Sequence, residues 1–234
     1  MLHKFPKRSQ RGVTLLELMI AITLVAGLST GMLMAMRTSL MTYEKTAKKL
    51  ESNRRFVKTQ EILSNQIAAV VPVQGACGGS EGQTIQGVSF LSGLPDALRL
   101  VTSYSIAEGA RGYPQIVEYR VLPEERGGVR LVATEHPYTG PQSIDGFCQG
   151  APGGIAYVLA ENLAYCHFFY HEPYKATTFI ETPWLPLWDK PLLPAGVRIE
   201  MRPVVPENGG LSVMNVTVPI MVDRDPRLMY DDRF

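Results

Sequence analysis

A long apolar run directly after a basic segment constrains the fold of this chain more than any other feature. Residues Val13–Met36 contain no Lys, Arg or Asp, and Arg37 ends the run. As an α-helix, this run of 24 residues would be about 36 Å long, which is enough to cross the ~30 Å hydrocarbon core of a bilayer. We therefore expect residues 13–36 to form a transmembrane helix.

The residues before this run predict its orientation. Four basic residues and no acid precede it: Lys4, Lys7, Arg8 and Arg11. Without them the formal charge changes from +1 to −3, because 19 of the 23 basic residues remain against 22 acidic ones. Basic residues stay on the cytoplasmic side of a membrane. We expect a single-pass membrane protein with a cytoplasmic N-terminus. Its C-terminal part would lie on the other side, which is the periplasm if the anchor lies in the inner membrane of a bacterial cell with two membranes.

Glu17 is the one acid inside the apolar run. A charged side chain near mid-bilayer costs about 2.5–3.5 kcal/mol on insertion scales, so a carboxylate there marks a functional site and needs a partner. A secretory signal peptide or a plain signal anchor would explain the run more simply. However, the apolar core of a signal peptide spans only about 7–15 residues and rarely holds an acid.

The stretch Arg11-Gly12-Val13-Thr14-Leu15-Leu16-Glu17 resembles the prepilin signal of type IV pilins and type II secretion pseudopilins. The resemblance implies a leader of residues 1–12, cleavage between Gly12 and Val13 by a prepilin peptidase, and methylation of the new N-terminus at Val13. It also implies that Glu17 pairs with the N-terminal amine of a neighbouring subunit. Glycine lacks a Cβ that would shield the scissile bond, and two charges that are costly alone in hydrocarbon compensate each other.

A helical pattern continues beyond Arg37. Apolar side chains recur at spacings of three and four residues or their sums, as on one face of a helix. These are Leu40, Tyr43, Ala47, Leu50, Val57, Leu63, Ile67 and Val70. No Pro or Gly interrupts Met32–Val71, and Pro72 follows. We expect one helix from about Val13 to Val71, whose amphipathic half, residues 37–71, packs on a globular domain.

The remainder, residues 72–234, is expected to be that β-rich periplasmic domain. Short β-branched and aromatic runs alternate with Gly- and Pro-rich turns. The expected strands are Ala97–Ser103, Gln115–Val121, Val129–Thr134, Leu163–Tyr170, Gly196–Pro203 and Ser212–Val222. Glu125–Gly128 and Glu207–Gly210 are expected hairpin turns, and Gly75–Gly87 and Ile144–Gly154 irregular loops. The predicted fold is α+β and pilin-like, with the long helix packed on an antiparallel sheet.

The order of these pieces resembles the minor pseudopilin J family of type II secretion systems. The matching stretches are Leu94–Thr102, Val117–Arg120 and Leu193–Met201, the last preceded by Trp184 and Trp188. The resemblance implies a non-enzymatic subunit at the tip of a short periplasmic pseudopilus. Its partners would be minor pseudopilins I, K and H, the major pseudopilin, the prepilin peptidase and methyltransferase, and exported proteins. Two alternatives remain: a minor pilin that initiates a type IV pilus, and a membrane-anchored periplasmic binding protein or enzyme.

The three cysteines, Cys77, Cys148 and Cys166, allow one disulfide in an oxidising compartment. Spacing alone leaves the pairing open. Because Cys77 and Cys148 lie in Gly-rich contexts and Cys166 lies in an apolar run, we expect a Cys77–Cys148 bridge and a buried Cys166 thiol.

Few residues suggest other chemistry. His167 and His171 would stand about 13 Å apart on a strand, so we expect no metal site there, although a helix could bring them together. The acids Asp223, Asp225, Asp231 and Asp232 are expected to be solvated rather than to hold calcium, which needs six or more oxygens. No motif of a cofactor or catalytic site is present, and the scattered basic residues predict no nucleic-acid binding. Trp184 and Trp188 could form a partner surface or pack in the core.

Overall fold

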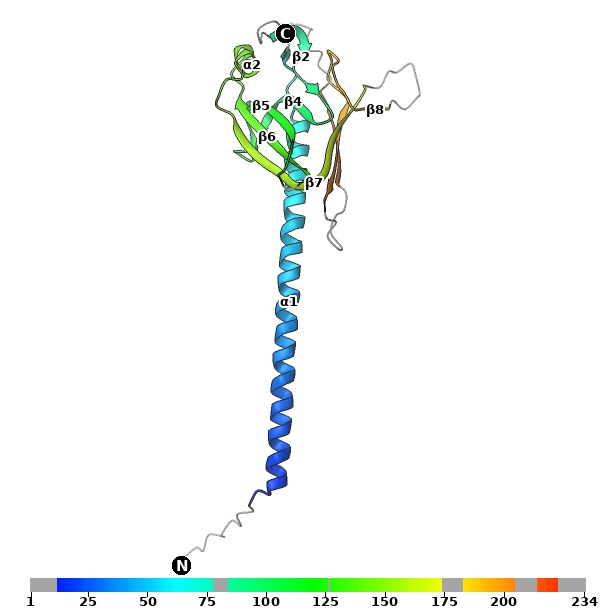
Figure 1. Ribbon diagram of the computed structural model, residues 1–234. Coiled ribbons are helices and arrows are strands. Elements are labelled where there is room, and N and C mark those ends of the chain that lie inside the picture. The colour runs from blue at the N-terminus through cyan, green and yellow to red at the C-terminus, as the bar shows by residue number, and fades with distance from the viewer. Residues whose placement is uncertain (1–11, 78–83, 126, 174–182, 205–213, 223–234) are drawn as a thin grey trace, which may run out of the picture. The chain divides into compact units, whose positions relative to one another are not determined.

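The computed structural model describes residues 12–77, 84–125, 127–173, 183–204 and 214–222. The chain divides into two compact units, Met1–Glu51 and Ser52–Phe234. Helix α1 spans Leu15–Ala68. Its residues up to Glu51 belong to the first unit, and its last turns belong to the second. The rest of the second unit is mainly antiparallel β-structure (Figure 1). The predicted order of a long apolar helix followed by an antiparallel sheet is confirmed.

Helix α1 ends at Ala68, three residues earlier than the sequence suggested. Its backbone leaves the helix to pair with a strand. Val71 N donates to Val101 O at 2.7 Å, and Ser103 N donates to Ala69 O at 3.0 Å. Pairing with the sheet therefore ends the helix before Pro72 does.

Within the described ranges, the main sheet has eight strands in the order β10-β9-β7-β6-β5-β4-β3, with β8 paired to β7. All of its pairings are antiparallel. The strands are β3 (Ser92–Gly93), β4 (Ala97–Ser105), β5 (Ala110–Pro123), β6 (Val129–Pro137), β7 (Ile155–His171), β8 (Trp184–Leu185), β9 (Gly196–Pro203) and β10 (Met214–Pro219). A second sheet pairs β1 (Gln74–Cys77) with β2 (Thr84–Ser89), and helix α2 spans Pro141–Cys148.

Each of the six expected strands has a counterpart: β4, β5, β6, β7, β9 and β10. The expected turn between β5 and β6 is present, and Gly127 and Gly128 adopt φ values of 86° and 90°, which favour glycine. The second expected turn, Glu207–Gly210, lies outside the described residues. The two expected irregular loops were wrong in part. Gly75–Gly87 contributes to β1 and β2, and Ile144–Gly154 contains the end of α2.

Helix α2 was missed because it is short and has Gly146 in its interior, where glycine disfavours a helix. Its formation depends on packing. Ile144 is fully buried in a small cluster with Phe90, Val101 and Ile116. Pro141 lies in the first turn, where its missing N–H costs no helical hydrogen bond.

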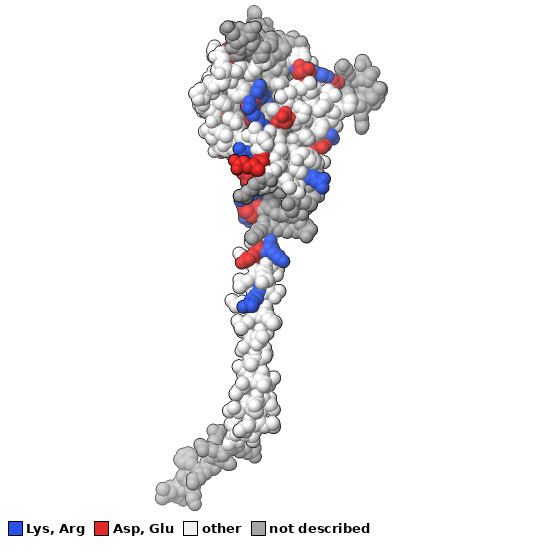
Figure 2. All heavy atoms as spheres, viewed as in Figure 1, with Lys and Arg blue, Asp and Glu red and all other residues white. Residues whose placement is uncertain are grey.

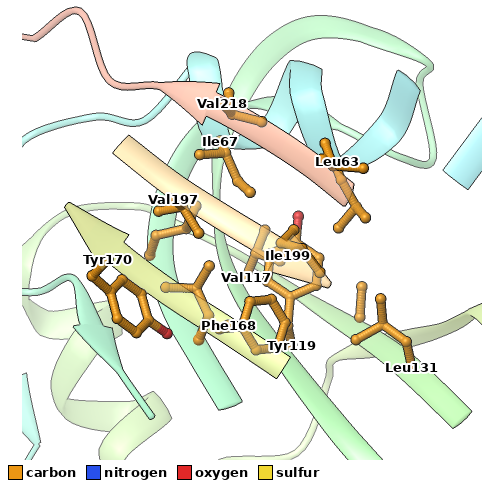
Figure 3. Close-up of a cluster of buried hydrophobic side chains, with 14 of the residues drawn as sticks. Leu63, Ile67, Val117, Tyr119, Leu131, Phe168, Tyr170, Val197, Ile199 and Val218 are labelled. Atoms are coloured by element: carbon orange, nitrogen blue, oxygen red, sulfur yellow. The ribbon is translucent and has the colours of Figure 1, made fainter. Parts of the chain in front are cut away.

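The core of the second unit lies between the last turns of α1 and one face of the main sheet. Leu63 and Ile67 of α1 are fully buried, together with Phe168, Val197 and Ile199 of the sheet (Figure 3). Buried aromatic side chains contribute to this core, and the rings of Tyr119 and Phe168 lie 6.2 Å apart. The sheet curves around these turns of the helix (Figure 1).

The expected apolar stripe has both buried and exposed members. Leu63, Ile67 and Val70 are buried in the second unit, and within the described residues the earlier members are exposed: Leu40, Tyr43, Ala47, Leu50 and Val57. Phe56 is partly buried against the core of the second unit. Packing of the whole amphipathic half, residues 37–71, on the domain stays a prediction.

A buried polar network fixes the helix against the sheet. Gln66 of α1 is fully buried, and its Nε2 donates to Glu135 Oε1 at 2.7 Å. Tyr119 Oη donates to Gln66 Oε1, and Ile106 N donates to the same Glu135 oxygen at 2.7 Å. Burial and the nearby Glu135 carboxylate raise the pKa of Tyr119 well above its usual value, which keeps the hydroxyl protonated as a donor. Each buried polar group of this network thus has a partner.

The remaining elements are tied by a disulfide between Cys77 of β1 and Cys148 of α2. This is the pair expected from the sequence. Cys166 is a free, buried thiol on β7, and burial raises its pKa to about 12. The disulfide joins residues 71 positions apart, so it restricts the unfolded protein strongly.

The polar network makes a first prediction. Gln66→Leu leaves Tyr119 Oη without its acceptor and removes one of the donors to the Glu135 carboxylate, which keeps the Ile106 N–H and the Ser105 hydroxyl. We expect a loss of about 2 kcal/mol in the free energy of unfolding. Urea unfolding of the full-length protein in detergent, followed by circular dichroism, measures this loss. Gln60→Leu, at an exposed position of the same helix, is the matched control and should change stability by under about 0.5 kcal/mol. Equal effects of both substitutions would contradict the proposed role of Gln66.

The disulfide makes a second prediction. Reduction with dithiothreitol should lower the melting temperature of the wild-type protein, because it releases a cross-link worth about 2–4 kcal/mol. The Cys77→Ala/Cys148→Ala variant should already melt at the lower temperature, and the reductant should not change it further. A melting temperature of the wild type that is insensitive to complete reduction would refute the stabilising role.

Candidate functional site

The segment that resembles a cleavage site lies directly before α1. Gly12, Val13 and Thr14 are exposed and have no regular secondary structure. Apart from Gly12 and its two chain neighbours, no atom of the described residues lies within 4 Å of the position that a Cβ would occupy at Gly12. Cleavage of the Gly12–Val13 bond stays a prediction, and the exposure of these residues is what a protease would need to reach it.

Glu17 lies in the first turn of α1 and is exposed. Its backbone N–H is 3.3 Å from Thr14 Oγ1 and 3.1 Å from Thr14 O. Thr14 and Glu17 thus have the spacing of a capping box, and a carboxylate at a helix N-terminus is favourable. A local role in starting the helix is therefore a simple explanation for Glu17. This local role does not explain why an acid is tolerated within an apolar run. In a membrane, the Glu17 carboxylate would need a cation from another part of the assembly.

The helix that follows has an apolar surface on all sides. Its residues Leu15–Ala47 are long and apolar enough to cross a membrane, and none of its most apolar window is buried inside the protein. Figure 2 shows this surface as almost free of charged side chains. Hydroxyl groups within it bond to carbonyls of the same helix: Thr23 Oγ1 donates to Ile20 O at 2.9 Å and Thr30 Oγ1 to Ala26 O at 2.8 Å. Internal satisfaction of polar groups is what a bilayer demands.

Two glycines that the sequence reasoning missed also lie on this helix. Gly27 and Gly31 are four residues apart and therefore lie on one face, and neither has an atom within 4 Å of its Cβ position. Small residues at this spacing let the backbones of two membrane helices approach closely. The signal that could have found them is the Gly-x-x-x-Gly spacing inside the apolar run.

Further along α1, towards and past the end of the transmembrane candidate, part of the helix surface is apolar and exposed. Leu40, Tyr43, Leu50 and Val57 are 54%, 74%, 51% and 56% exposed. Their spacings of three and seven residues place them on one side of the helix. An apolar stripe of this length on a helix is usually covered by another element.

The two tryptophans occupy different environments. Trp188 is 1% exposed, and its Nε1 donates to Leu192 O at 2.9 Å, so it packs in the core rather than forming a partner surface. Trp184 is half-buried on β8, with the Arg198 guanidinium 4.7 Å from its ring centroid and the His171 ring at 5.0 Å. Its indole ring is thus largely covered by residues of β7 and β9.

No metal-binding arrangement is found within the described ranges. No three His, Cys, Asp or Glu residues there are grouped so that they could hold an ion. His167 and His171 both lie on strand β7, as expected. The ring of His167 stacks on Tyr165, and the ring of His171 lies tilted against Trp184 with centroids 5.0 Å apart. The acids Asp223, Asp225, Asp231 and Asp232 lie outside the residues that the structure describes.

The comparisons with known proteins agree with the N-terminal geometry. Residues 7–35 match the family described as prokaryotic N-terminal methylation motif. The match contains the Gly12–Val13 bond, Glu17 and both helix glycines. No curated protein matches the sequence. The methylation motif, followed directly by a helix that can cross a membrane, indicates a type IV pilin-like or pseudopilin protein.

Proposed function

We propose that this protein is a minor pseudopilin of a type II secretion system, most similar to the J family. It is inserted in the inner membrane, cleaved after Gly12 by the prepilin peptidase, methylated at Val13 and assembled at the tip of a periplasmic pseudopilus. The observation that carries the proposal is the methylation motif at residues 7–35 with an exposed apolar helix directly behind it. In this role the protein is a substrate of an enzyme and is not itself an enzyme.

The chemistry of assembly follows from the first mature residues. Cleavage after Gly12 exposes an α-amine at Val13, which stays cationic at neutral pH if it is methylated. The Glu17 carboxylate is exposed at the start of the helix and can face the amine of a neighbouring subunit. In an apolar surrounding, each charge alone is costly and the pair is much less so. The pair therefore favours the register in which the amine of one subunit meets Glu17 of another.

The uncovered surfaces of α1 supply the packing. Gly27 and Gly31 allow close approach of a second helix, and the exposed stripe from Leu40 to Val57 offers apolar area past the membrane. Removing apolar side chains from water stabilises contacts by about 25 cal/mol per Å². We propose that neighbouring helices of the pseudopilus cover these surfaces.

The choice of the J family rests on the globular domain. The stretches that carry the resemblance, Leu94–Thr102, Val117–Arg120 and Leu193–Met201, include parts of strands β4, β5 and β9 of one sheet. The proposed partners are minor pseudopilins I, K and H, the major pseudopilin and exported proteins. The proposed location of the domain is the periplasm, where the Cys77–Cys148 disulfide is stable.

Processing is tested by co-expressing the full-length protein with a prepilin peptidase. We expect a mature protein that begins at Val13, detected by intact-protein mass spectrometry as the loss of residues 1–12. Gly12→Val should abolish cleavage, because a β-branched side chain shields the scissile bond. The Gly31→Val variant, which carries the same change within helix α1, should still be cleaved. A product that keeps Met1, or that is cut near Met36, would overturn the pilin-like assignment.

Assembly is tested with Glu17→Gln in cells that carry the other pseudopilins and the peptidase. We expect normal cleavage but a loss of about tenfold or more in co-purified partners, because the amine of the neighbour is left without its counter-charge. Glu44→Gln, at an exposed position further along the helix, is the matched control and should recover partners like the wild type. Unchanged recovery with Glu17→Gln would remove the proposed role of Glu17.

The same purification distinguishes a pseudopilin of a type II secretion system from a minor pilin of a type IV pilus. Recovery of minor pseudopilins I, K or H with the wild-type protein supports the type II secretion assignment. Recovery of type IV pilus subunits, with none of these pseudopilins, would reassign the protein to the minor pilins that initiate a pilus.

A further inference from the structure

A half-open cavity of about 270 Å³ lies on the second unit. Its polar wall consists of Arg99 on β4, Glu118 and Arg120 on β5, and His136 on β6. Its apolar wall consists of Phe147 on α2 and the Cys77–Cys148 disulfide. Segments far apart in the sequence thus meet here.

Two guanidinium groups share one carboxylate in this cavity. Arg99 Nε lies 2.5 Å from Glu118 Oε1, and Arg120 Nε lies 2.8 Å from Glu118 Oε2. Arg120 Nη2 also donates to Glu118 Oε1 at 3.0 Å. The three side chains therefore carry one net positive charge. Each guanidinium has five N–H donors, so the two together offer more donors than Glu118 can accept.

The two arginine side chains are more exposed to solvent than the glutamate, so the positive charge lies on the solvent side of the cavity. The side chain of Glu118 is 11% exposed, whereas those of Arg99 and Arg120 are 34% and 54% exposed. A ligand that enters from solvent meets the guanidinium groups before the carboxylate. One net charge suits a monoanion, and the planar guanidinium fork matches the two oxygens of a carboxylate.

The apolar wall is held in place from several sides. The Phe147 ring lies 5.9 Å from the Arg99 guanidinium and packs edge-on against His136 at 5.2 Å and Phe90 at 6.0 Å. The neighbouring Cys148 is tied to β1 by the disulfide. Because the Phe147 side chain is already fixed, a ligand that packs on it does not have to pay the entropy of ordering that side chain on binding.

A second cavity, of about 410 Å³, adjoins the first and shares His136, Phe147 and Ala151 with it. It continues past Ser143 and Pro152. The first cavity is slightly below, and the second within, the range of about 300–1,000 Å³ typical of ligand sites. Because the two adjoin, they offer room for a charged group in the first cavity and for the polypeptide that carries it in the second.

We propose that these two cavities bind a carboxylate of a polypeptide. Arg99 and Arg120 bind the carboxylate, and an adjacent apolar side chain packs on Phe147 towards the second cavity. The carboxylate can be the C-terminus of the bound polypeptide or an Asp or Glu side chain within it. Recognition of either group by arginines is a recurring mode of peptide binding.

Nuclear magnetic resonance of the full-length protein in detergent micelles, labelled with ¹⁵N-arginine, tests this proposal. The Nε–H signals of Arg99 and Arg120 are assigned with Arg99→Lys and Arg120→Lys. Three probes are titrated: acetyl-Ala-Ala-Leu with a free C-terminus, its C-terminal amide, and acetyl-Ala-Glu-Leu-amide. We expect saturable shifts of both signals with at least one carboxylate-bearing peptide and none with the uncharged amide.

Substitution gives the second readout. Arg120→Gln should weaken binding by about fivefold, measured at the Arg99 signal, because Glu118 keeps one partner and the site loses one guanidinium. Arg202→Gln, at an exposed position of β9 outside both cavities, should leave binding unchanged.

Each outcome decides a point. Binding of the free-acid peptide alone assigns the site to polypeptide C-termini, and binding of the Glu peptide alone assigns it to acidic side chains. Binding of both supports a general carboxylate site. Equal shifts with the uncharged amide, no shift with any peptide at about 10 mM, or undiminished affinity in Arg120→Gln would each overturn the proposal.

Discussion

Every other part of the molecule has to accommodate the uninterrupted apolar surface at the start of α1. No part of the most apolar window of Leu15–Ala47 is buried among the residues that the structure describes, so this segment needs lipid or other helices around it. The hydroxyls of Thr23 and Thr30 bond carbonyls of the same helix, so these two side chains need no further polar partner there. In the proposed function, Glu17 lies close to the predicted cleavage bond and connects membrane insertion with processing and assembly.

The end of the same helix has the opposite character. From about Phe56, α1 is part of a folded core, where Leu63 and Ile67 pack on the sheet and Gln66 is held by Tyr119 and Glu135. A buried polar network accepts only one register of the helix, because any shift would leave its groups without partners. Apolar packing supplies stability, and the network specifies how the helix lies on the sheet.

Between these two parts lies a stretch of α1 that is apolar on one face and uncovered. From the sequence, Leu40, Tyr43, Leu50 and Val57 belong to the same stripe as Leu63 and Ile67. In the structure Leu63 and Ile67 are buried in the core of the second unit, whereas Leu40, Tyr43, Leu50 and Val57 are exposed among the described residues. In the proposed function, these exposed side chains form a surface that a neighbouring subunit covers.

Local signals in the sequence were enough to predict a helix that can cross a membrane and most strands of the sheet. Those signals are an apolar run and alternating residues between turns. The short motif predicts the cleavage bond and the role of Glu17, and both stay predictions. Tertiary contacts were needed to show where α1 ends, that Trp188 lies in the core, and that Ile144 of α2 is buried against Phe90 and Ile116. They also brought Arg99, Arg120, Phe147 and Cys77 to one cavity. These outcomes depend on residues far apart in the sequence, and no local pattern records which of them will meet.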